Sequence, residues 1–278
     1  MNCFSIIIPA YDEEKLIGNR IKNLLEPLAP NCNEIIIVCN GCTDATAAQA
    51  RKIINQLAIN SEHDCHINVV ELDIGSKINA LNHGINISKN PISVVLDADI
   101  EISSADCAEL VNFMNNNNLL AASPTPKFNY KQANWLNKRF YKIVSSSTYN
   151  KEHRIANVIA LSAEAKTKLF PLPNVIADDA YIQRTIGKSD YKLLNTINYT
   201  FNCPRTILAM LKVQSRIVRG NLELKSKYPN LIAPKSKVSK SSAIDRAIFI
   251  TIKTTAHIIA RLELLFNVKK WHKDDSSR

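Results

Sequence analysis

Apolar and polar residues alternate in blocks along the first 120 residues of the chain. Short β-branched runs predict buried strands, and longer amphipathic stretches predict helices. The predicted strands are residues 4–8, 34–39, 67–72 and 92–96, and the predicted helices are residues 13–28, 43–57, 77–87 and 103–114. Pro9 is expected to end the first strand. This alternation predicts right-handed crossovers, a mostly parallel central sheet flanked by helices, and the α/β fold class.

The pattern changes after residue 123, where Pro124 and Pro126 interrupt it. The later predicted elements are a strand at residues 119–123, a helix at about 133–149, an extended segment at 154–162, and a helix that opens at Pro204 and ends at Gly220. The apolar side chains of the first of these helices are expected in the core, and they are Trp135, Phe140, Tyr141 and Val144.

A last helix is predicted at residues 243–266, after a Lys/Ser segment at 235–242 that has the composition of a linker. Six apolar residues are expected to share one of its faces: Ile244, Ile248, Ile252, Ile259, Leu262 and Phe266. Lys253, His257 and Arg261 follow one another at four-residue steps on another face. Packing on the main domain and anchoring at a surface are both open, and the second predicts peripheral attachment to the inner face of a membrane.

Composition narrows the classes of protein. The 278 residues carry a formal net charge of +10, which favours anionic partners such as nucleic acid, anionic lipid head groups or nucleotide diphosphates. Because no apolar run is long enough to span a bilayer, no signal peptide precedes the first strand, and seven cysteines suit a reducing compartment, we expect a cytoplasmic protein. The six glycines form neither Gly-x-Gly-x-x-Gly nor a Walker loop, which excludes the common dehydrogenases and P-loop enzymes.

Two carboxylates, Asp97 and Asp99, follow the predicted strand at residues 92–96. Ligands gather at the carboxyl ends of strands in open α/β sheets. Two like charges at such a place favour a hard cation, Mg²⁺ or Mn²⁺, together with ligand phosphates. The sequence therefore predicts a metal and diphosphate site. The alternative is that Asp97 only begins a turn and that Asp99 caps the helix that starts near Ser103.

Five short motifs occur at predicted strand ends or helix starts. They are Ile8-Pro9-Ala10-Tyr11-Asp12-Glu13-Glu14, Asn40-Gly41-Cys42-Thr43-Asp44, Lys77-Ile78-Asn79-Ala80-Leu81-Asn82, Asp97-Ala98-Asp99 and Asp178-Asp179. In this order they resemble the family 2 glycosyltransferases, whose nucleotide-sugar domain has the GT-A fold. The resemblance implies a GT-A domain at residues 1–225, with a nucleotide-sugar half (1–123) and an acceptor half (124–225), and a C-terminal linker and amphipathic helix at 226–278.

The resemblance implies which residues of the first half bind the nucleotide-sugar: Pro9, Tyr11, Glu13, Asp44, Lys77 and Asp97. Tyr11 would stack on the base, Glu13 would accept hydrogen bonds from the ribose, and Asp44 would accept the uracil imide N–H. Each also has a local alternative: Tyr11 as a turn residue, Glu13 as a charge in the first turn of a helix, and Asp44 as a helix cap. Lys77, without a carboxylate nearby in the sequence, would reach a phosphate, Asp97 would face ribose or metal, and Asp99 would bind Mn²⁺ or Mg²⁺.

The family's acidic pair is usually Glu-Asp, and its second member is the general base. Here it is Asp178-Asp179, and alignment on Ile182 assigns the base to Asp179, with Asp178 as the second choice or a helix cap. The usual Gln-x-x-Arg-Trp is altered, since the segment 214–220 keeps a Gln, two arginines and a Gly but has no Trp. Either Arg216 or Arg219 would then contact the diphosphate, the alternative being a solvated helix face. The missing Trp argues against a polymerising enzyme.

The activity implied is an inverting, hexosyltransferase-type transfer from a UDP-sugar or other nucleotide-sugar to a hydroxyl acceptor. The implied context is cell-surface polysaccharide or glycolipid synthesis, with a lipid-linked glycan as acceptor, an anionic membrane surface as partner and no nucleic acid. Two other hypotheses were weighed. One is a catalytically inactive basic binding protein on the same scaffold, and the other is a zinc protein that uses Cys39, Cys42, His63 and His66.

Overall fold

The protein folds into two compact units, each made of segments that are distant in the sequence. The computed structural model describes residues 3–58, 65–238 and 241–266. The first unit contains the described parts of Met1–Pro124, Ile155–Asn174 and Thr185–Tyr199, and the second those of Thr125–Arg154, Val175–Arg184 and Thr200–Arg278.

The first unit is built on strands that alternate with helices. Its elements are β1 (Phe4–Ala10), α1 (Glu14–Leu25), β2 (Cys32–Asn40), α2 (Thr46–Ala58), β3 (His66–Leu72), α3 (Lys77–Ile87), β4 (Ile92–Leu96), α4 (Ser104–Asn116), β6 (Val158–Leu161) and α6 (Ala163–Leu169). Three further elements, β5 (Ala121–Asn129), α7 (Asp178–Ile186) and β7 (Tyr191–Asn202), begin in one unit and end in the other.

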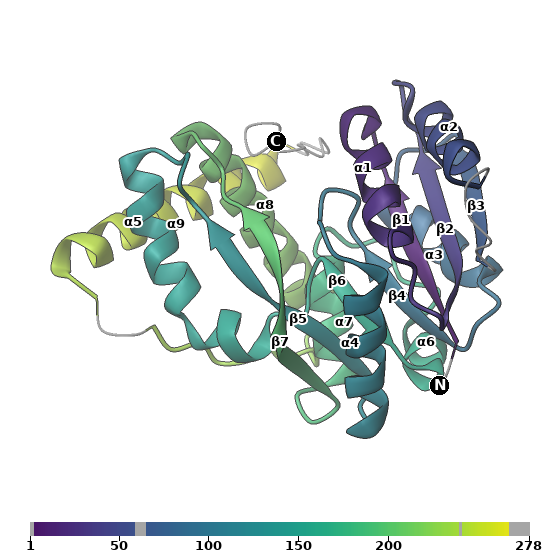
Figure 1. The fold of residues 1–278 in the computed structure, drawn as a ribbon. Coiled ribbons are helices and arrows are strands. Elements are labelled where there is room, and N and C mark those ends of the chain that lie inside the picture. The colour runs from purple at the N-terminus through teal and green to yellow at the C-terminus, as the bar shows by residue number, and fades with distance from the viewer. Residues whose placement is uncertain (1–2, 59–64, 239–240, 267–278) are drawn as a thin grey trace. The chain divides into compact units, whose positions relative to one another are not determined.

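The strands form one sheet in the order β3-β2-β1-β4-β6-β5-β7. The first four strands are parallel, and β6 runs antiparallel to both β4 and β5. The β1 and β4 strands are buried along their whole length, as expected for strands covered on both faces. Figure 1 shows α1 and α2 on one face of the sheet and α3 on the other. Ile7, Ile36 and Val38 of the sheet pack with Ala80 and Ile85 of α3.

Two strands run through prolines that the sequence analysis took as boundaries. The β1 strand continues past Pro9, because β4 pairs with it only as far as Ile7 and needs no backbone N–H from Pro9. The β5 strand passes through Pro124 and Pro126, because its pairing with β6 involves only its first two residues, Ala121 and Ala122. The predicted ends at Pro9 and at residue 123 were therefore wrong.

The second unit is mainly helical, with α5 (Trp135–Ser146), a short π-helical turn η1 (Tyr149–His153), α8 (Ile207–Lys227) and α9 (Ala243–Leu265). Its core joins α5, α8 and α9 through Phe140, Tyr141, Met210 and Ile252. Trp135 was predicted in this core, but it begins α5 and is 58% exposed, with the Arg139 guanidinium 5.3 Å from its ring.

Gly220 does not end a helix, contrary to prediction, because α8 continues to Lys227. A Cβ at Gly220 would lie 2.7 Å from the Cβ of Ala177 and 3.1 Å from its backbone nitrogen. Glycine is therefore present because α8 and the segment before α7 approach closely, and not because the chain turns there.

The buried side of α9 is centred beside the predicted apolar face and not on it. Its buried residues are Asp245, Ile252, Ala256 and Ala260, and the last three pack with residues of α5 and α8. Three of the six residues predicted to share one apolar face, Ile244, Leu262 and Phe266, are exposed. The predicted linker at 235–242 lies partly outside the described residues. No helix among the described residues is both long and apolar enough to span a bilayer.

Candidate active site

The carboxyl ends of β1, β2, β3 and β4 lie at one edge of the first unit, because these four strands are parallel and adjacent. The turns that follow β1, β2 and β4 contain Tyr11, Asp44 and Asp97, whereas Lys77 begins α3 after β3. The predicted residue Pro9 lies buried one position before the end of β1, and its contact with the nucleotide-sugar stays a prediction.

Two glycines allow the turns after β2 and β3 to touch. Gly41 has a φ of +60°, and a Cβ on it would lie 2.5 Å from the backbone nitrogen of Gly75. The ring of Tyr11 lies on the other side of Gly75, where an added Cβ would be 3.4 Å from the Tyr11 Cε2 atom. The structure therefore brings Tyr11, half-buried, to the meeting point of three turns. Its role in base stacking stays a prediction.

Aspartate side chains join the turns after β1 and β2. Asp12, with a φ of 51°, accepts hydrogen bonds from the backbone N–H of Thr43 at 2.7 Å and of Asp44 at 3.4 Å. Asp44 in turn accepts from the backbone N–H of Glu14 at 3.1 Å and of Thr46 at 3.0 Å. Asp44 thus caps the starts of both α1 and α2, as its local alternative required. Asp44 Oδ1 also accepts from the Thr46 hydroxyl, so an imide N–H would have to be accepted by Oδ2, and this contact stays a prediction.

Glu13 is almost fully buried at the start of α1. Its backbone N–H donates to the Thr46 hydroxyl at 2.7 Å, and its carbonyl accepts the first hydrogen bonds of α1 from Leu16 and Ile17. The backbone of Glu13 is therefore fixed between the first two turns. Contact of its carboxylate with a ribose stays a prediction.

Asp97 is held at the end of β4 by an ion pair with one side chain and a hydrogen bond from another. Lys77 Nζ lies 2.9 Å from Asp97 Oδ1, and Asn157 Nδ2 donates to Asp97 Oδ2 at 2.9 Å. Lys77 therefore has a carboxylate partner twenty positions on, which the sequence analysis missed because the pair forms only when α3 and β4 come together. A further backbone hydrogen bond, 2.8 Å from Asp97 N to Asn157 O, fixes the same pair.

Asn157 is a site residue that the sequence analysis did not identify. It has a φ of 66°, a conformation that asparagine tolerates better than most residues, and its Oδ1 accepts from the Tyr199 hydroxyl at 3.0 Å. Because β6 runs antiparallel to β4, with Val158 opposite Leu96, the residue before β6 lies beside the residue after β4. Only this pairing, which the sequence pattern did not predict, could have indicated Asn157.

Asp99 is exposed, two residues beyond Asp97 in a turn closed by Ile100 N–H to Asp97 O at 3.0 Å. It does not cap the following helix. Ser103 does so, in a capping box in which its hydroxyl accepts from Asp106 N–H at 3.0 Å. The capping alternative for Asp99 is therefore wrong, and its role in binding a metal stays a prediction.

The acidic pair lies in the second unit, where Asp178 and Asp179 are half-buried in the first turn of α7. The preceding segment is tied to α8, because Ile176 N–H donates to Glu223 Oε2 at 2.7 Å and Ala177 lies against Gly220. Tyr149 of η1 is close enough to Asp179 for the two side chains to interact electrostatically. Burial raises the pKa of Tyr149, and the Asp179 carboxylate adds to that rise, against nearby arginines that lower it.

The two candidate arginines occupy different environments on α8. Arg219 is buried, and its Nη1 lies 3.5 Å from Glu263 Oε2 of α9. Arg216, three positions earlier, is half-buried. Arg219 therefore helps to hold α8 to α9, so the alternative in which both arginines lie on a solvated helix face is wrong, and contact of either arginine with the diphosphate stays a prediction.

The zinc hypothesis fails on the register of the sheet. Cys39 pairs with Glu71 at one end of β2 and β3, whereas His66 lies beside Glu34 at the other end, about 17 Å away at the usual rise per residue. His63 lies outside the described residues. The Cys39 thiol instead hydrogen bonds with Cys42, which lowers the pKa of Cys42 to about 7.

Within the described part of the chain, Asp12, Cys42 and Asp44 have potential ligand atoms within 4.8 Å of one another. The two carboxylates accept hydrogen bonds from backbone N–H groups of the same turn, and these bonds already explain why the carboxylates lie close together. The cluster therefore gives no independent indication of a metal.

Comparison with known proteins identifies the family of the chain. The model of glycosyl transferase family 2 matches residues 5–160, more than half of the chain. A dodecaprenyl-phosphate galacturonate synthase from Rhizobium johnstonii is 24% identical over 111 residues, which are 39% of this chain and 31% of that protein. The chain thus aligns with less than a third of this relative's length.

Solved structures show the same fold. A mannosyltransferase from Pyrobaculum calidifontis, in complex with GDP-Man and Mn²⁺, has a TM-score of 0.63 at 17% identity, covering 98% of this chain and 76% of its own. Glucosyl-3-phosphoglycerate synthase from Mycobacterium tuberculosis, with Mn²⁺, UDP and phosphoglyceric acid, has a TM-score of 0.58 at 16% identity, covering 81% and 78%. The predicted GT-A fold class is confirmed, and the chain belongs to glycosyl transferase family 2.

Proposed function

We propose that this family 2 glycosyltransferase moves a sugar from a UDP-sugar to a hydroxyl acceptor with inversion at the anomeric carbon. The observation that carries the proposal is the arrangement at the end of β4. There Asp97 is held by Lys77 and Asn157, and Asp99 lies exposed in the next turn, so two carboxylates stand together at the carboxyl end of a buried strand.

The carboxylates fit a hard divalent cation, Mn²⁺ or Mg²⁺, because their donor atoms are oxygens in the set that these ions prefer. Both Asp97 oxygens already accept from Lys77 and Asn157, so we assign the direct ligand to Asp99 and a supporting place to Asp97. When bound, the cation would offset negative charge on the departing nucleotide diphosphate.

The choice of UDP rests on the turns after β1 and β2. Two similar structures contain GDP-Man or UDP with Mn²⁺, so a nucleoside diphosphate is their shared ligand chemistry. In this chain Asp44 offers carboxylate acceptors at the carboxyl end of β2, and Tyr11 offers a flat ring beside Gly75. A uracil has both an imide N–H for the first and an aromatic face for the second. Arg216 would contact the diphosphate.

We assign the general base to Asp179. Its carboxylate would take the proton of the acceptor hydroxyl while the hydroxyl oxygen bonds to the anomeric carbon and the bond from that carbon to the diphosphate breaks. Asp178 is the second choice. A positioned base contributes roughly 10²–10⁴-fold to a rate.

We further propose a lipid-linked acceptor in the synthesis of a cell-surface polysaccharide or glycolipid. The support is the name of the Rhizobium relative, which includes a polyprenyl phosphate, dodecaprenyl phosphate. Since the alignment covers 39% of this chain, the acceptor is proposed separately from the sugar transfer itself.

The test is nucleotide release from a panel of UDP- and GDP-sugars with lipid-linked and water-soluble acceptors, in Mn²⁺ or with a chelator. The proposal expects UDP release from a UDP-sugar only with the cation and the wild-type chain, and not with Asp179→Asn. UDP binding without release from any donor would support the inactive binding protein instead. Release that is equal in the chelator would overturn the metal assignment.

A further inference from the structure

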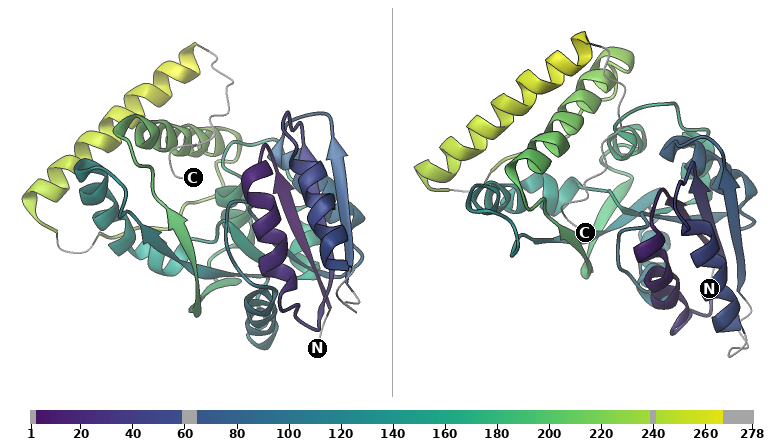
Figure 2. Two further views of the ribbon diagram at one scale, coloured as in Figure 1. Left: turned by 45° about the horizontal axis from the view of Figure 1, so that its top comes forward. Right: turned by 90° about the horizontal axis from the view of Figure 1, so that it is seen from above.

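Helix α9 of the second unit has two different faces. The packed face contacts α5 and α8, as the yellow helix beside the green one shows in Figure 2. The remaining surface of α9 bears six large apolar side chains that are 45–78% exposed: Ile244, Ile250, Ile258, Leu262, Leu264 and Leu265, with Phe266 directly after the helix at 77%. Spacings of three, four and seven residues connect Ile258, Leu262, Leu265 and Phe266, which places an apolar stripe over the C-terminal part of the helix.

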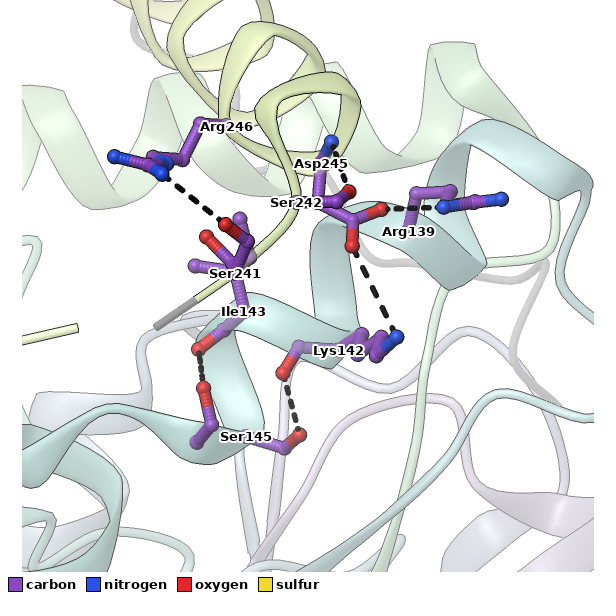
Figure 3. Close-up of polar contacts among 9 residues, drawn as sticks. Arg139, Lys142, Ile143, Ser145, Ser241, Ser242, Asp245 and Arg246 are labelled. Carbon is purple, nitrogen blue, oxygen red and sulfur yellow. Dashed lines mark hydrogen bonds and ion pairs between the residues drawn. The ribbon is translucent and has the colours of Figure 1, made fainter. Parts of the chain in front are cut away.

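The helix turns both of its carboxylates inward. Asp245 is 1% exposed, with Arg139 Nη1 2.9 Å from its Oδ1 and Lys142 Nζ 3.9 Å from its Oδ2 (Figure 3). The hydrogen bond from Arg139 lowers the pKa of Asp245, which keeps this carboxylate ionised. Near the other end, Glu263 pairs with the buried Arg219. The exposed side of α9 is therefore left without a negative charge.

The exposed ionisable side chains of α9 are basic. Arg246 and Arg261 are exposed, and His257 lies between them in the sequence and is exposed as well. Lys253 is the exception among the basic residues, because it turns inward and donates to Gln214 Oε1 at 2.8 Å. Further lysines flank the helix in the sequence, at positions 235, 237 and 240 before it and 269, 270 and 273 after it.

We infer that the exposed face of α9 docks on an anionic lipid surface, with the helix axis along the membrane plane. An apolar stripe bordered by cations fits acyl chains below and phosphate groups beside it. A second copy of this chain fits less well, because pairing the two faces would bring arginines together without a carboxylate to neutralise them. At 23 residues α9 is about 35 Å long, but its charged residues prevent it from spanning the bilayer.

The test is sedimentation of the full-length chain with vesicles of phosphatidylcholine alone or mixed with phosphatidylglycerol. We expect binding to the mixed vesicles and much weaker binding to phosphatidylcholine. The double variant Ile258→Ser with Leu262→Ser removes two apolar contacts and should weaken binding to the mixed vesicles by about tenfold or more. Arg246→Gln with Arg261→Gln should reduce the preference for phosphatidylglycerol.

A matched control removes two exposed apolar side chains of the second unit that are not on α9, through Leu208→Ser with Ile232→Ser. It should bind vesicles as the wild type does. UDP affinity, measured for each variant by calorimetry, should stay unchanged and keeps this test separate from that of the transferase activity. Absence of binding to mixed vesicles, or an equal loss in the control, would overturn the inference. So would a wild-type dimer that the Ile258/Leu262 variant converts to monomer.

Discussion

The two units hold their candidate functional residues in place by different means. In the first unit, Asp12, Asp44 and Asp97 are fixed by hydrogen bonds between turns at the ends of parallel strands. In the second unit, the segment before Asp178 is fixed by the packing of helix α8, through Gly220 and Glu223. The first arrangement depends on local geometry that the sheet dictates, whereas the second depends on how helices pack.

This difference predicts that substitutions in the two units fail in different ways. A change to a turn carboxylate of the first unit should weaken donor binding while the fold persists, because its neighbours belong to a buried sheet. A change in the second unit should affect turnover or stability with donor binding nearly kept. The following predictions are ordered from the largest expected effect to the smallest.

The largest effect is expected from Asp179→Asn. Removing the proton acceptor should lower kcat for sugar transfer by roughly 10²–10⁴-fold, while Kd for UDP stays nearly unchanged. Asp178→Asn is the matched control. Neighbouring helix residues point about a quarter turn apart, so only one of the two can face an acceptor, and Asn can still cap a helix.

The measurement is kcat beside the Kd for UDP in both variants. If Asp178→Asn is inactive while Asp179→Asn still turns over, the base is Asp178. If both variants lose UDP binding, the assignment of donor binding to the first unit and of turnover to the second unit is wrong.

The next effect concerns the cation. Asp99→Asn should weaken Mn²⁺-dependent UDP binding by roughly 10–100-fold or more. Removing a residue that only hydrogen bonds to a metal ligand typically lowers metal affinity by that factor, and removing a ligand should cost at least as much. Isothermal titration of UDP with Mn²⁺ and with a chelator measures it. Glu101→Gln, an exposed carboxylate two residues on that pairs with Arg20 at 3.3 Å, is the control and should bind UDP normally. Equal UDP affinity of wild type and Asp99→Asn would remove Asp99 from the metal site.

The sequence was sufficient for the strand-end part of this site. Buried β-branched runs followed by Tyr11, Asp44 and Asp97 were readable because parallel strands bring their carboxyl ends to one edge whatever the details of packing. The partners of Asp97 were not readable. Lys77 reaches it across a helix and a strand, and Asn157 comes from a strand whose antiparallel pairing follows no local pattern.

The last helix of the second unit was predicted in extent but not in orientation. The last helix was expected at 243–266 and occurs at Ala243–Leu265, yet its packed face is centred on Ala256 and Ala260 rather than on its largest apolar residues. Small residues are buried there because α8 lies close, and an apolar stripe elsewhere on α9 is left exposed. Periodicity identifies a helix, but its neighbours decide which side is buried.

The two arginines of α8 offer a smaller and more selective test. Arg216→Gln should raise the Kd for UDP by about tenfold, the value of one charge-assisted hydrogen bond, with the melting temperature unchanged. Arg219→Gln should keep UDP affinity and lower the free energy of unfolding by about 1–3 kcal/mol, because Glu263 loses its partner in a mostly buried place. Calorimetry and thermal melts of both variants check this. The reverse assignment of effects would place Arg219 at the diphosphate.

The smallest effect is expected from Gly220→Ala, and it tests whether helix packing positions the acidic pair. Alanine favours a helix interior by up to about 1 kcal/mol over glycine. Here its Cβ would meet the Ala177 Cβ at 2.7 Å, and overpacking typically costs about 1–3 kcal/mol. The gain offsets only part of the cost and leaves a loss of up to about 2 kcal/mol, so the melting temperature should fall by a few degrees. Yet Ala177 directly precedes Asp178, so relief of the clash should displace the start of α7.

We therefore expect kcat to fall several-fold more than stability alone explains, with the Kd for UDP unchanged. Gly18→Ala is the matched control, because Gly18 also lies inside a helix of the first unit, but its added Cβ would meet only side-chain atoms, Ile53 Cγ1 at 3.2 Å and Gln49 Nε2 at 3.5 Å. That variant should keep kcat. If Gly220→Ala keeps both kcat and melting temperature, the segment before α7 yields without cost, and α8 does not position Asp178 and Asp179. If the two glycine variants lose kcat equally, the loss reflects general destabilisation rather than the place of the acidic pair.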